Sequence, residues 1–175
     1  MLKAIIILDQ IQAGLGGKEK ADTPYGGKRI AMGSADTIER QLNKKDGVLL
    51  GTFYCGTDYY EKDKSIVQRK FAKMAEKMGA NLVILGPTFD YPEFSKMACE
   101  IAEYIQNETD IQVIVASAYE KNEELINQYK SKLYIVKTPK KGGTGLSQAL
   151  DNIISGSEIL TTNGDKDKFK TEFCY

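Results

Sequence analysis

The sequence of 175 residues contains no histidine, which excludes every reaction that uses an imidazole as its general base. Its three cysteines, Cys55, Cys99 and Cys174, are odd in number and lie far apart. This argues against a disulfide framework and favours a reducing, cytoplasmic location. Because histidine and paired cysteines are both missing, we expect no zinc, haem or other metal site.

Long apolar segments are also missing. The first apolar run, residues 2–8, is too short for a secretory signal and meets Asp9 at once. No other run approaches the ~20 apolar residues that a membrane span needs. Basic and acidic residues balance at 24 each, so no overall field attracts nucleic acid or an anionic membrane. We therefore expect the partners to be proteins or small molecules rather than nucleic acid or a membrane. A homo-oligomer is compatible with this composition.

The main pattern in the sequence is a set of five short apolar runs, separated by segments with helical periodicity. Because the runs lack polar alternation, they are predicted to be strands buried on both faces. Their order predicts an α/β fold with a five-stranded parallel sheet in a three-layer α/β/α arrangement, flavodoxin-like or Rossmann-like, with strand order 2-1-3-4-5 as the simplest topology. We expect residues 1–155 to form this single domain and residues 156–175 to form a polar tail or a packing arm. The predicted strands are residues 2–8, 47–54, 81–86, 111–117 and 132–137.

The segments that follow the strands are unusually rich in glycine, proline, tyrosine and acidic residues. The loop Ala13–Gly27 after the first strand is far longer than the two to six residues of an ordinary connection. Ligands of parallel sheets bind beyond the carboxyl ends of the strands. The sequence therefore predicts a ligand site at this edge. Its aromatic residues either frame a pocket or simply cap the sheet; they are Tyr54, Tyr59, Tyr60, Phe89, Tyr91 and Tyr119.

Two glycine-rich segments invite comparison with phosphate-binding loops. Gly14–Gly17 matches neither the dinucleotide-binding pattern nor the P-loop. Gly142, Gly143 and Thr144 precede a predicted helix and are the better candidate for an anion site, although they also suit an ordinary turn. A phosphorelay receiver domain is excluded, because the third strand ends in Gly86-Pro87 where the phosphoacceptor aspartate would be required.

Cys55 is the candidate nucleophile. It follows the second strand, where neighbouring N–H groups or cations would activate a thiolate by lowering its pKa. No second cysteine stands close to it in the sequence, so a C-x-x-C redox motif is absent. The alternative is that Cys55 is a small packing residue at the end of a strand.

Four segments together resemble a known family. "AGLGGKEKADTP", "FYCGTDYYEKD", "GPTFDYPEFSKMACEIAEYIQ" and "YKSKLYIVKT" are similar, in order and spacing, to the amino-terminal half of component B of the glycine/sarcosine/betaine reductases. The B component of D-proline reductase is a related protein. The resemblance covers roughly residues 3 to 154, and the first two blocks are its most specific parts.

The resemblance implies which residues form a ligand site. Glu19, Asp22 and Asp58 would orient a cationic amine, with Tyr59 and Phe89 as walls. The ligand-binding residues implied at the strand ends are Gly16, Gly17, Glu19, Asp22, Gly56, Asp58, Tyr59, Gly86, Pro87, Phe89 and Tyr119.

The resemblance also implies a partner. In this family a pyruvoyl group on a partner subunit holds the substrate amine, and a selenol of component B takes part in reductive C–N cleavage. The selenocysteine motif belongs to the carboxy-terminal half of the family, outside the matched segments. We therefore expect no cofactor in this chain, and either a small amine ligand or docking to the pyruvoyl subunit. The alternatives are a nucleotide- or phosphometabolite-binding regulatory domain, and an enzyme with Cys55 as nucleophile.

Overall fold

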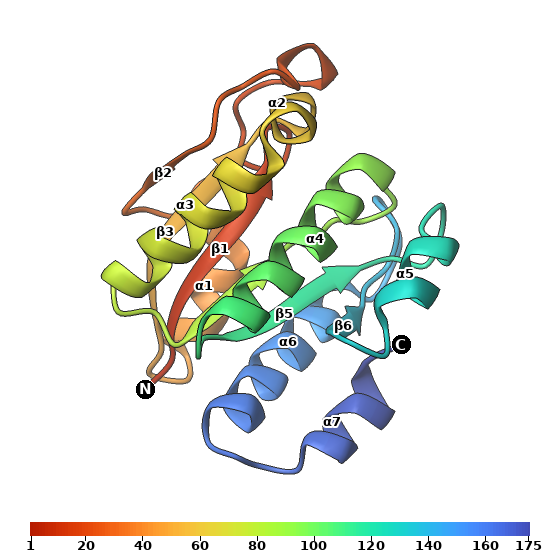
Figure 1. The fold of residues 1–175 in the computed structure, drawn as a ribbon. Coiled ribbons are helices and arrows are strands. Elements are labelled where there is room, and N and C mark those ends of the chain that lie inside the picture. The colour runs from red at the N-terminus through yellow and green to blue at the C-terminus, as the bar shows by residue number, and fades with distance from the viewer.

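A computed structural model describes all 175 residues and shows one sheet with helices on both faces (Figure 1). The sheet order is β2-β3-β1-β4-β5-β6, and every neighbouring pair is parallel except β2 and β3. The α/β class and the order of the five predicted strands are confirmed. The strands are β1 (Lys3–Asp9), β2 (Gly26–Lys28), β3 (Val48–Cys55), β4 (Leu82–Leu85), β5 (Gln112–Ser117) and β6 (Tyr134–Lys137).

The predicted number of strands was wrong by one, because the first loop contributes the short edge strand β2. Gly26 and Gly27 of this strand lie opposite Tyr54 and Phe53 of β3. A Cβ atom on Gly26 would lie 2.5 Å from the Tyr54 hydroxyl, and one on Gly27 would lie 2.7 Å from the Phe53 ring. The strand therefore forms because its glycines leave room for two large rings, and an apolar pattern could not reveal it.

The helices form one layer on each side of the sheet. In Figure 1, α3 and α4 lie in front of the strands, with α5 beyond α4, while α1 and α6 lie behind. Contacts of α3 with α4, α4 with α5, and α1 with α6 agree with these layers. The helices are α1 (Ala35–Asn43), α2 (Thr57–Lys62), α3 (Lys64–Lys77), α4 (Pro92–Glu108), α5 (Glu123–Tyr129), α6 (Leu146–Thr161) and α7 (Lys166–Phe173), with a 3-10 turn η1 (Lys18–Lys20) in the first loop.

The core follows from this layering. Residues 4–8 of β1 and 82–85 of β4 are fully buried, because helices cover both faces of the central strands. Near the β3 edge, Phe53 stacks on Phe71 of α3 with ring centroids 5.2 Å apart. The apolar runs in the sequence are thus the centre of the sheet.

The last twenty residues are folded against the sheet edge. Helix α6 continues to Thr161, so the boundary placed after residue 155 falls inside it. In α7, Phe169 is buried and stacks on Tyr134 of β6 at 5.3 Å. The backbone N–H of Tyr175 donates to the carbonyl of Ile135 at 3.1 Å. None of the helices has the length and apolar character needed to cross a lipid bilayer.

Candidate functional site

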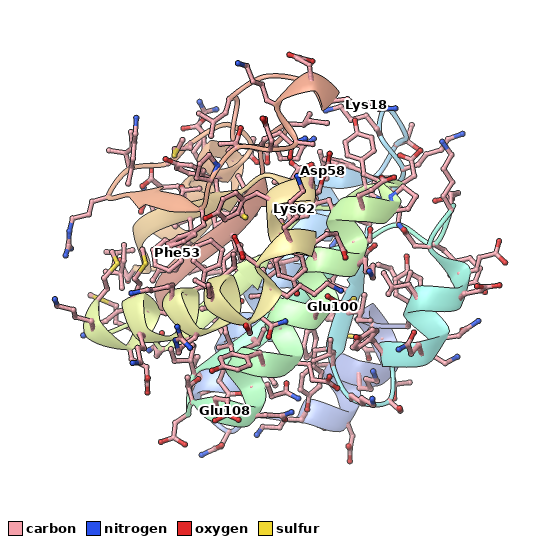
Figure 2. All side chains as sticks on the ribbon, turned by 45° about the horizontal axis from the view of Figure 1, so that its top comes forward. Lys18, Phe53, Asp58, Lys62, Glu100 and Glu108 are labelled. Atoms are coloured by element: carbon pink, nitrogen blue, oxygen red, sulfur yellow. The ribbon has the colours of Figure 1, made fainter.

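A pocket of about 400 Å³ opens at the carboxyl ends of β1 and β4. The chain leaves β1 toward β3 on one side and returns to β4 on the other, so this is the switch point of the sheet, where ligands of such folds bind. Figure 2 shows two lining residues, Lys18 of the first loop and Asp58 of α2, at this end of the molecule. We call it the strand-end pocket; its lining is Asp9, Gln10, Ile11, Lys18, Ala21, Thr57, Asp58, Asp90, Tyr91, Pro92, Glu93, Phe94 and Lys121.

Asp9 is the most unusual group of the strand-end pocket. It ends β1 and is only 2% exposed, and its Oδ1 accepts a hydrogen bond from the backbone N–H of Gln12 at 2.7 Å. Burial raises the pKa of its carboxyl to about 6, although backbone hydrogen bonds oppose the rise. Sequence reasoning did not select Asp9 as a ligand residue. The available signal was an acidic residue directly after the first buried strand.

The first loop is anchored to the start of α2 by main-chain hydrogen bonds. The carbonyl of Ala21 accepts from the N–H groups of Asp58 at 2.8 Å and Tyr59 at 3.1 Å, and the N–H of Gly56 donates to Thr23 at 2.8 Å. A Cβ atom on Gly56 would lie 2.2 Å from the Ala21 carbonyl oxygen. Glycine at this position therefore allows the loop to approach β3.

This anchoring decides which loop residues reach the strand-end pocket. Lys18 and Ala21 line it, whereas Gly16, Gly17, Glu19 and Asp22 do not. The exposed Glu19 carboxylate accepts from the N–H of Gly17 at 3.0 Å, and this hydrogen bond lowers the pKa of Glu19. Glu19 therefore stabilises its own turn.

The segment after β3 supplies one lining carboxylate and a buried thiol. Asp58 is exposed and lines the strand-end pocket. Cys55 is fully buried, and burial raises the pKa of its thiol to about 12. This is the environment of a packing residue and opposes a nucleophilic role. Tyr59 is half-buried beside Tyr25, with ring centroids 6.2 Å apart, and lies outside the lining.

The segment after β4 forms the support of the strand-end pocket. Gly86 and Pro87 are buried and joined by a cis peptide bond. Phe89 has a left-handed backbone with φ of 53° and its side chain is buried. The side-chain amide of Asn122 donates to the Phe89 carbonyl at 3.0 Å. This segment holds the following residues, Asp90 and Tyr91, in the lining.

The remaining predicted residues lie beside the strand-end pocket. Tyr119 is 40% exposed and packs on Tyr175 with centroids 5.8 Å apart. Gly142, Gly143 and Thr144 are exposed in the loop before α6. That loop contacts the pocket edge through Lys141, whose N–H donates to Asp90 Oδ1 at 2.9 Å and whose ammonium lies 4.9 Å from the Phe89 ring centroid.

The structure thus brings Asp58 into a lining with charged groups that sequence reasoning missed, namely Asp9, Lys18, Asp90, Glu93 and Lys121. Asp90 and Lys121 form an ion pair at 3.6 Å. No group of three or more cysteine, aspartate or glutamate side chains is arranged to hold a metal ion. The arrangement is suited to binding a small charged ligand.

Comparison with known proteins identifies related chains. The family model described as glycine/sarcosine/betaine reductase selenoprotein B matches residues 1–171. The glycine reductase complex component B subunit gamma of Carboxydothermus hydrogenoformans is 25% identical over 136 residues, covering 78% of this chain and 31% of that protein. The sarcosine reductase complex component B subunit beta of Peptoclostridium acidaminophilum is 23% identical over 137 residues, with the same coverages. No solved structure matches the chain significantly.

These matches define how far the likeness extends. The chain spans about a third of the length of the curated relatives it matches, and those relatives are subunits of reductase complexes. The family model, in contrast, covers all but the last four residues of the chain. The chain belongs to the glycine/sarcosine/betaine reductase selenoprotein B family.

Proposed function

We propose that this domain binds a small amine or amino-acid-like ligand in the strand-end pocket, within an assembly of the reductase component B type. The observation that carries the proposal is the charge of the lining. Four acidic residues, Asp9, Asp58, Asp90 and Glu93, line one pocket of about 400 Å³ together with only two basic ones, Lys18 and Lys121. This excess of negative charge favours a cationic ligand.

Two of the carboxylates are the best candidates to hold an ammonium group. Lys121 partly neutralises Asp90, and Glu93 is exposed at the start of α4. Asp9, in contrast, is buried, where a charged hydrogen bond is stronger than in water. Asp58 lies in the same lining. An ammonium between Asp9 and Asp58 would relieve the cost of burying the Asp9 carboxylate.

Another part of the strand-end pocket suits a carboxylate at the opposite end of such a ligand. Helix α4, which is 17 residues long, begins at Pro92, and Pro92, Glu93 and Phe94 line the strand-end pocket. The free N–H groups of a first helical turn and the helix dipole favour an anion. Lys18 adds a positive charge on the loop side. A ligand with an ammonium and a carboxylate, such as an amino acid, matches both ends.

In this proposal a partner subunit supplies the pyruvoyl group, whose carbonyl captures an amine. The lining carboxylates fit that role, since they would hold the amine before its capture. The residues of this chain bind and orient the ligand. Docking of the domain onto the pyruvoyl subunit, without a ligand of its own, is the second form of the same proposal.

A regulatory domain that binds a nucleotide or phosphometabolite is the rival. The exposed Gly142–Thr144 segment before α6 is in its favour. The net negative charge of the strand-end pocket opposes binding of such a ligand there. A nucleotide or phosphometabolite carries several negative charges, and unlike an amino acid it need not carry an ammonium group that offsets them.

Thermal-shift and calorimetric titrations of the 175-residue protein distinguish amine binding from nucleotide binding. Glycine and sarcosine should raise the melting temperature, whereas acetate, which lacks the amine, and nucleotides should not. Asp58→Asn should weaken amine binding at least tenfold, because a hydrogen bond to a charged group contributes about 1.5–3 kcal/mol.

Asp22→Asn is the matched control, since Asp22 is an exposed acid of the first loop outside the lining, and it should leave binding unchanged. A melting temperature raised by nucleotides but not by amines would support the rival. No shift with any small molecule would reject ligand binding and leave docking onto a partner.

A further inference from the structure

Helix α3 carries a basic surface that the strand-end pocket does not use. Four exposed cations, those of Arg69, Lys70, Lys73 and Lys77, follow Ile66 at spacings of three, four, seven and eleven residues. At 3.6 residues per turn these positions share one face of the helix. We call these five residues the α3 stripe. Glu76 is the single carboxylate within the helix.

The charges of the α3 stripe have no partners within the chain. None of its four cations takes part in any of the ion pairs, side-chain hydrogen bonds or cation–π contacts of the protein. Like charges four residues apart, as in Arg69 with Lys73 and Lys73 with Lys77, destabilise a helix.

An exposed apolar residue lies within the same face. Ile66 is 39% exposed at the head of the α3 stripe. A purely solvated helix face gains nothing from an exposed isoleucine, whereas a docking surface buries it. Charge and apolar exposure therefore coincide on one face.

The complementary charge is found on the chain itself. The first 80 residues carry 14 basic and 10 acidic side chains, and residues 81–175 carry 10 basic and 14 acidic ones. Part of this acidic excess forms a compact surface around the start of α5, made by exposed Glu120, Glu123 and Glu124, which we call the α5 patch. None of the three glutamates forms an ion pair, and Lys121 between them is paired with Asp90.

The two surfaces lie on opposite flanks of one helical layer. Helix α4 contacts α3 on one side and α5 on the other, and Figure 1 shows it between them. One copy of the chain therefore cannot bring its own α3 stripe against its own α5 patch, but two copies can.

We propose that the α3 stripe docks on the α5 patch of a second copy of this chain. The contact is electrostatic, with Ile66 as an apolar residue at one end of it, and it joins two different surfaces. Such a contact continues from copy to copy unless the rotation closes a ring. It also places a second copy beside Lys121 at the rim of the strand-end pocket.

Sedimentation velocity of the full chain at several protein concentrations tests the proposal. At about 0.01 M salt, where the Debye length is about 30 Å, species larger than a monomer should form; at about 1 M salt, where it is about 3 Å, they should dissociate. Replacing the four cations (Arg69→Gln, Lys70→Gln, Lys73→Gln and Lys77→Gln) should leave only monomer at low salt. So should Glu120→Gln, Glu123→Gln and Glu124→Gln together.

Two controls make the result specific. Lys3→Gln, Lys44→Gln, Lys140→Gln and Lys168→Gln together remove the same charge from exposed lysines elsewhere, and this variant should still associate. An equimolar mixture of the stripe and patch variants should recover a pair, because each retains one intact surface. Unchanged far-ultraviolet circular dichroism shows that the variants fold. A monomer at low salt, association that survives in the stripe variant, or a mixture that stays monomeric overturns the proposal.

Discussion

At the scale of single residues, Asp9 is the buried carboxyl whose ionisation we expect to affect both stability and the proposed ligand binding. Its carboxyl has a pKa of about 6 in the folded protein against an ordinary value of 3.8. A raised carboxyl pKa means that the folded state is favoured below pH 3.8 and loses this advantage as the pH rises through 6. At pH 8 the ionised group costs the folded state on the order of 2–3 kcal/mol.

Asp9→Asn should therefore raise the free energy of unfolding at pH 8 by about 2 kcal/mol, and the difference should vanish near pH 4. The amide oxygen can still accept from the N–H of Gln12, as Oδ1 does now. Urea titrations at several pH values measure this. The same variant should lose the amine-induced thermal shift, since the neutral amide no longer attracts an ammonium. If the unchanged protein and Asp9→Asn are equally stable at pH 8, ionisation of Asp9 does not destabilise the folded state.

Gly56 is a second residue whose role is specific, because backbone atoms surround the position of its missing side chain. In Gly56→Ala, the new methyl group would meet the Ala21 carbonyl oxygen at 2.2 Å and the Thr23 nitrogen at 2.6 Å. We expect a loss of about 2–3 kcal/mol of stability and displacement of the first loop. Thermal unfolding and hydrogen exchange at Asp58 measure the two effects.

Gly142→Ala is the control for this substitution. Its φ of 80° disfavours alanine while no atom lies within 4 Å of the new Cβ, whereas Gly56 has an ordinary φ of −65° and is crowded. Gly142→Ala should therefore lose only about 1 kcal/mol. A loss in Gly56→Ala no larger than that in Gly142→Ala would contradict the expected crowding by Ala21 and Thr23.

The site residues were predictable only where a side chain follows its strand directly. Asp58, three residues after Cys55, lies in the strand-end pocket, and Asp9 would have been found by the same rule. Glu19 and Asp22 lie in a loop whose path is set by main-chain hydrogen bonds to Ala21 and Thr23. Those bonds leave no pattern in the side chains, so the sequence could not show which loop residues line the strand-end pocket.

At the scale of elements, the sequence predicted the strands that are buried on both faces. Strands such as β4, with all four residues buried, appear as uninterrupted apolar runs. Strand β2 and helix α2 were missed for a common reason. β2 is held by pairing of glycines with β3, and α2 spans only six residues that continue directly from Gly56. Both depend on tertiary contacts rather than on a periodic pattern.

Helix α7 offers a test at this scale, because a loose tail and a packing arm predict different outcomes. Phe169 is buried, stacks on Tyr134, and occupies the space above Gly156, where a Cβ atom would lie 2.2 Å from its ring. Phe169→Ala should lower the free energy of unfolding of the whole domain by about 3–5 kcal/mol. Phe173→Ala, at a half-buried position, should cost less. Equilibrium unfolding in urea compares them, and an unchanged midpoint for Phe169→Ala would indicate an independent tail.

At the scale of the whole molecule, the chain lacks a reactive nucleophile for bond cleavage, although it has a pocket that suits the proposed ligand binding. Cleaving a C–N bond reductively needs a reactive nucleophile, and the thiols of this chain are all buried. Burial raises the pKa of Cys55 and Cys99 to about 12 and that of Cys174 to about 11. With no histidine to serve as a base, no thiolate is available near neutral pH. The strand-end pocket is instead lined by charged residues, which suit the binding of a ligand that we propose.

The purified 175-residue protein, supplied with glycine and a dithiol, should therefore form no acetate even when it binds glycine. Acetate and ammonia release are measured over time, with calorimetry on the same sample to establish that the ligand is bound. Iodoacetamide should label Cys55 more slowly than free cysteine in the native protein, and at the ordinary rate once urea unfolds it, because burial rather than the local sequence suppresses the thiolate. Rapid native labelling of Cys55 would mean that its thiol is accessible and reactive in the folded protein, and acetate formed by this chain unaided would mean that the domain is catalytic in its own right.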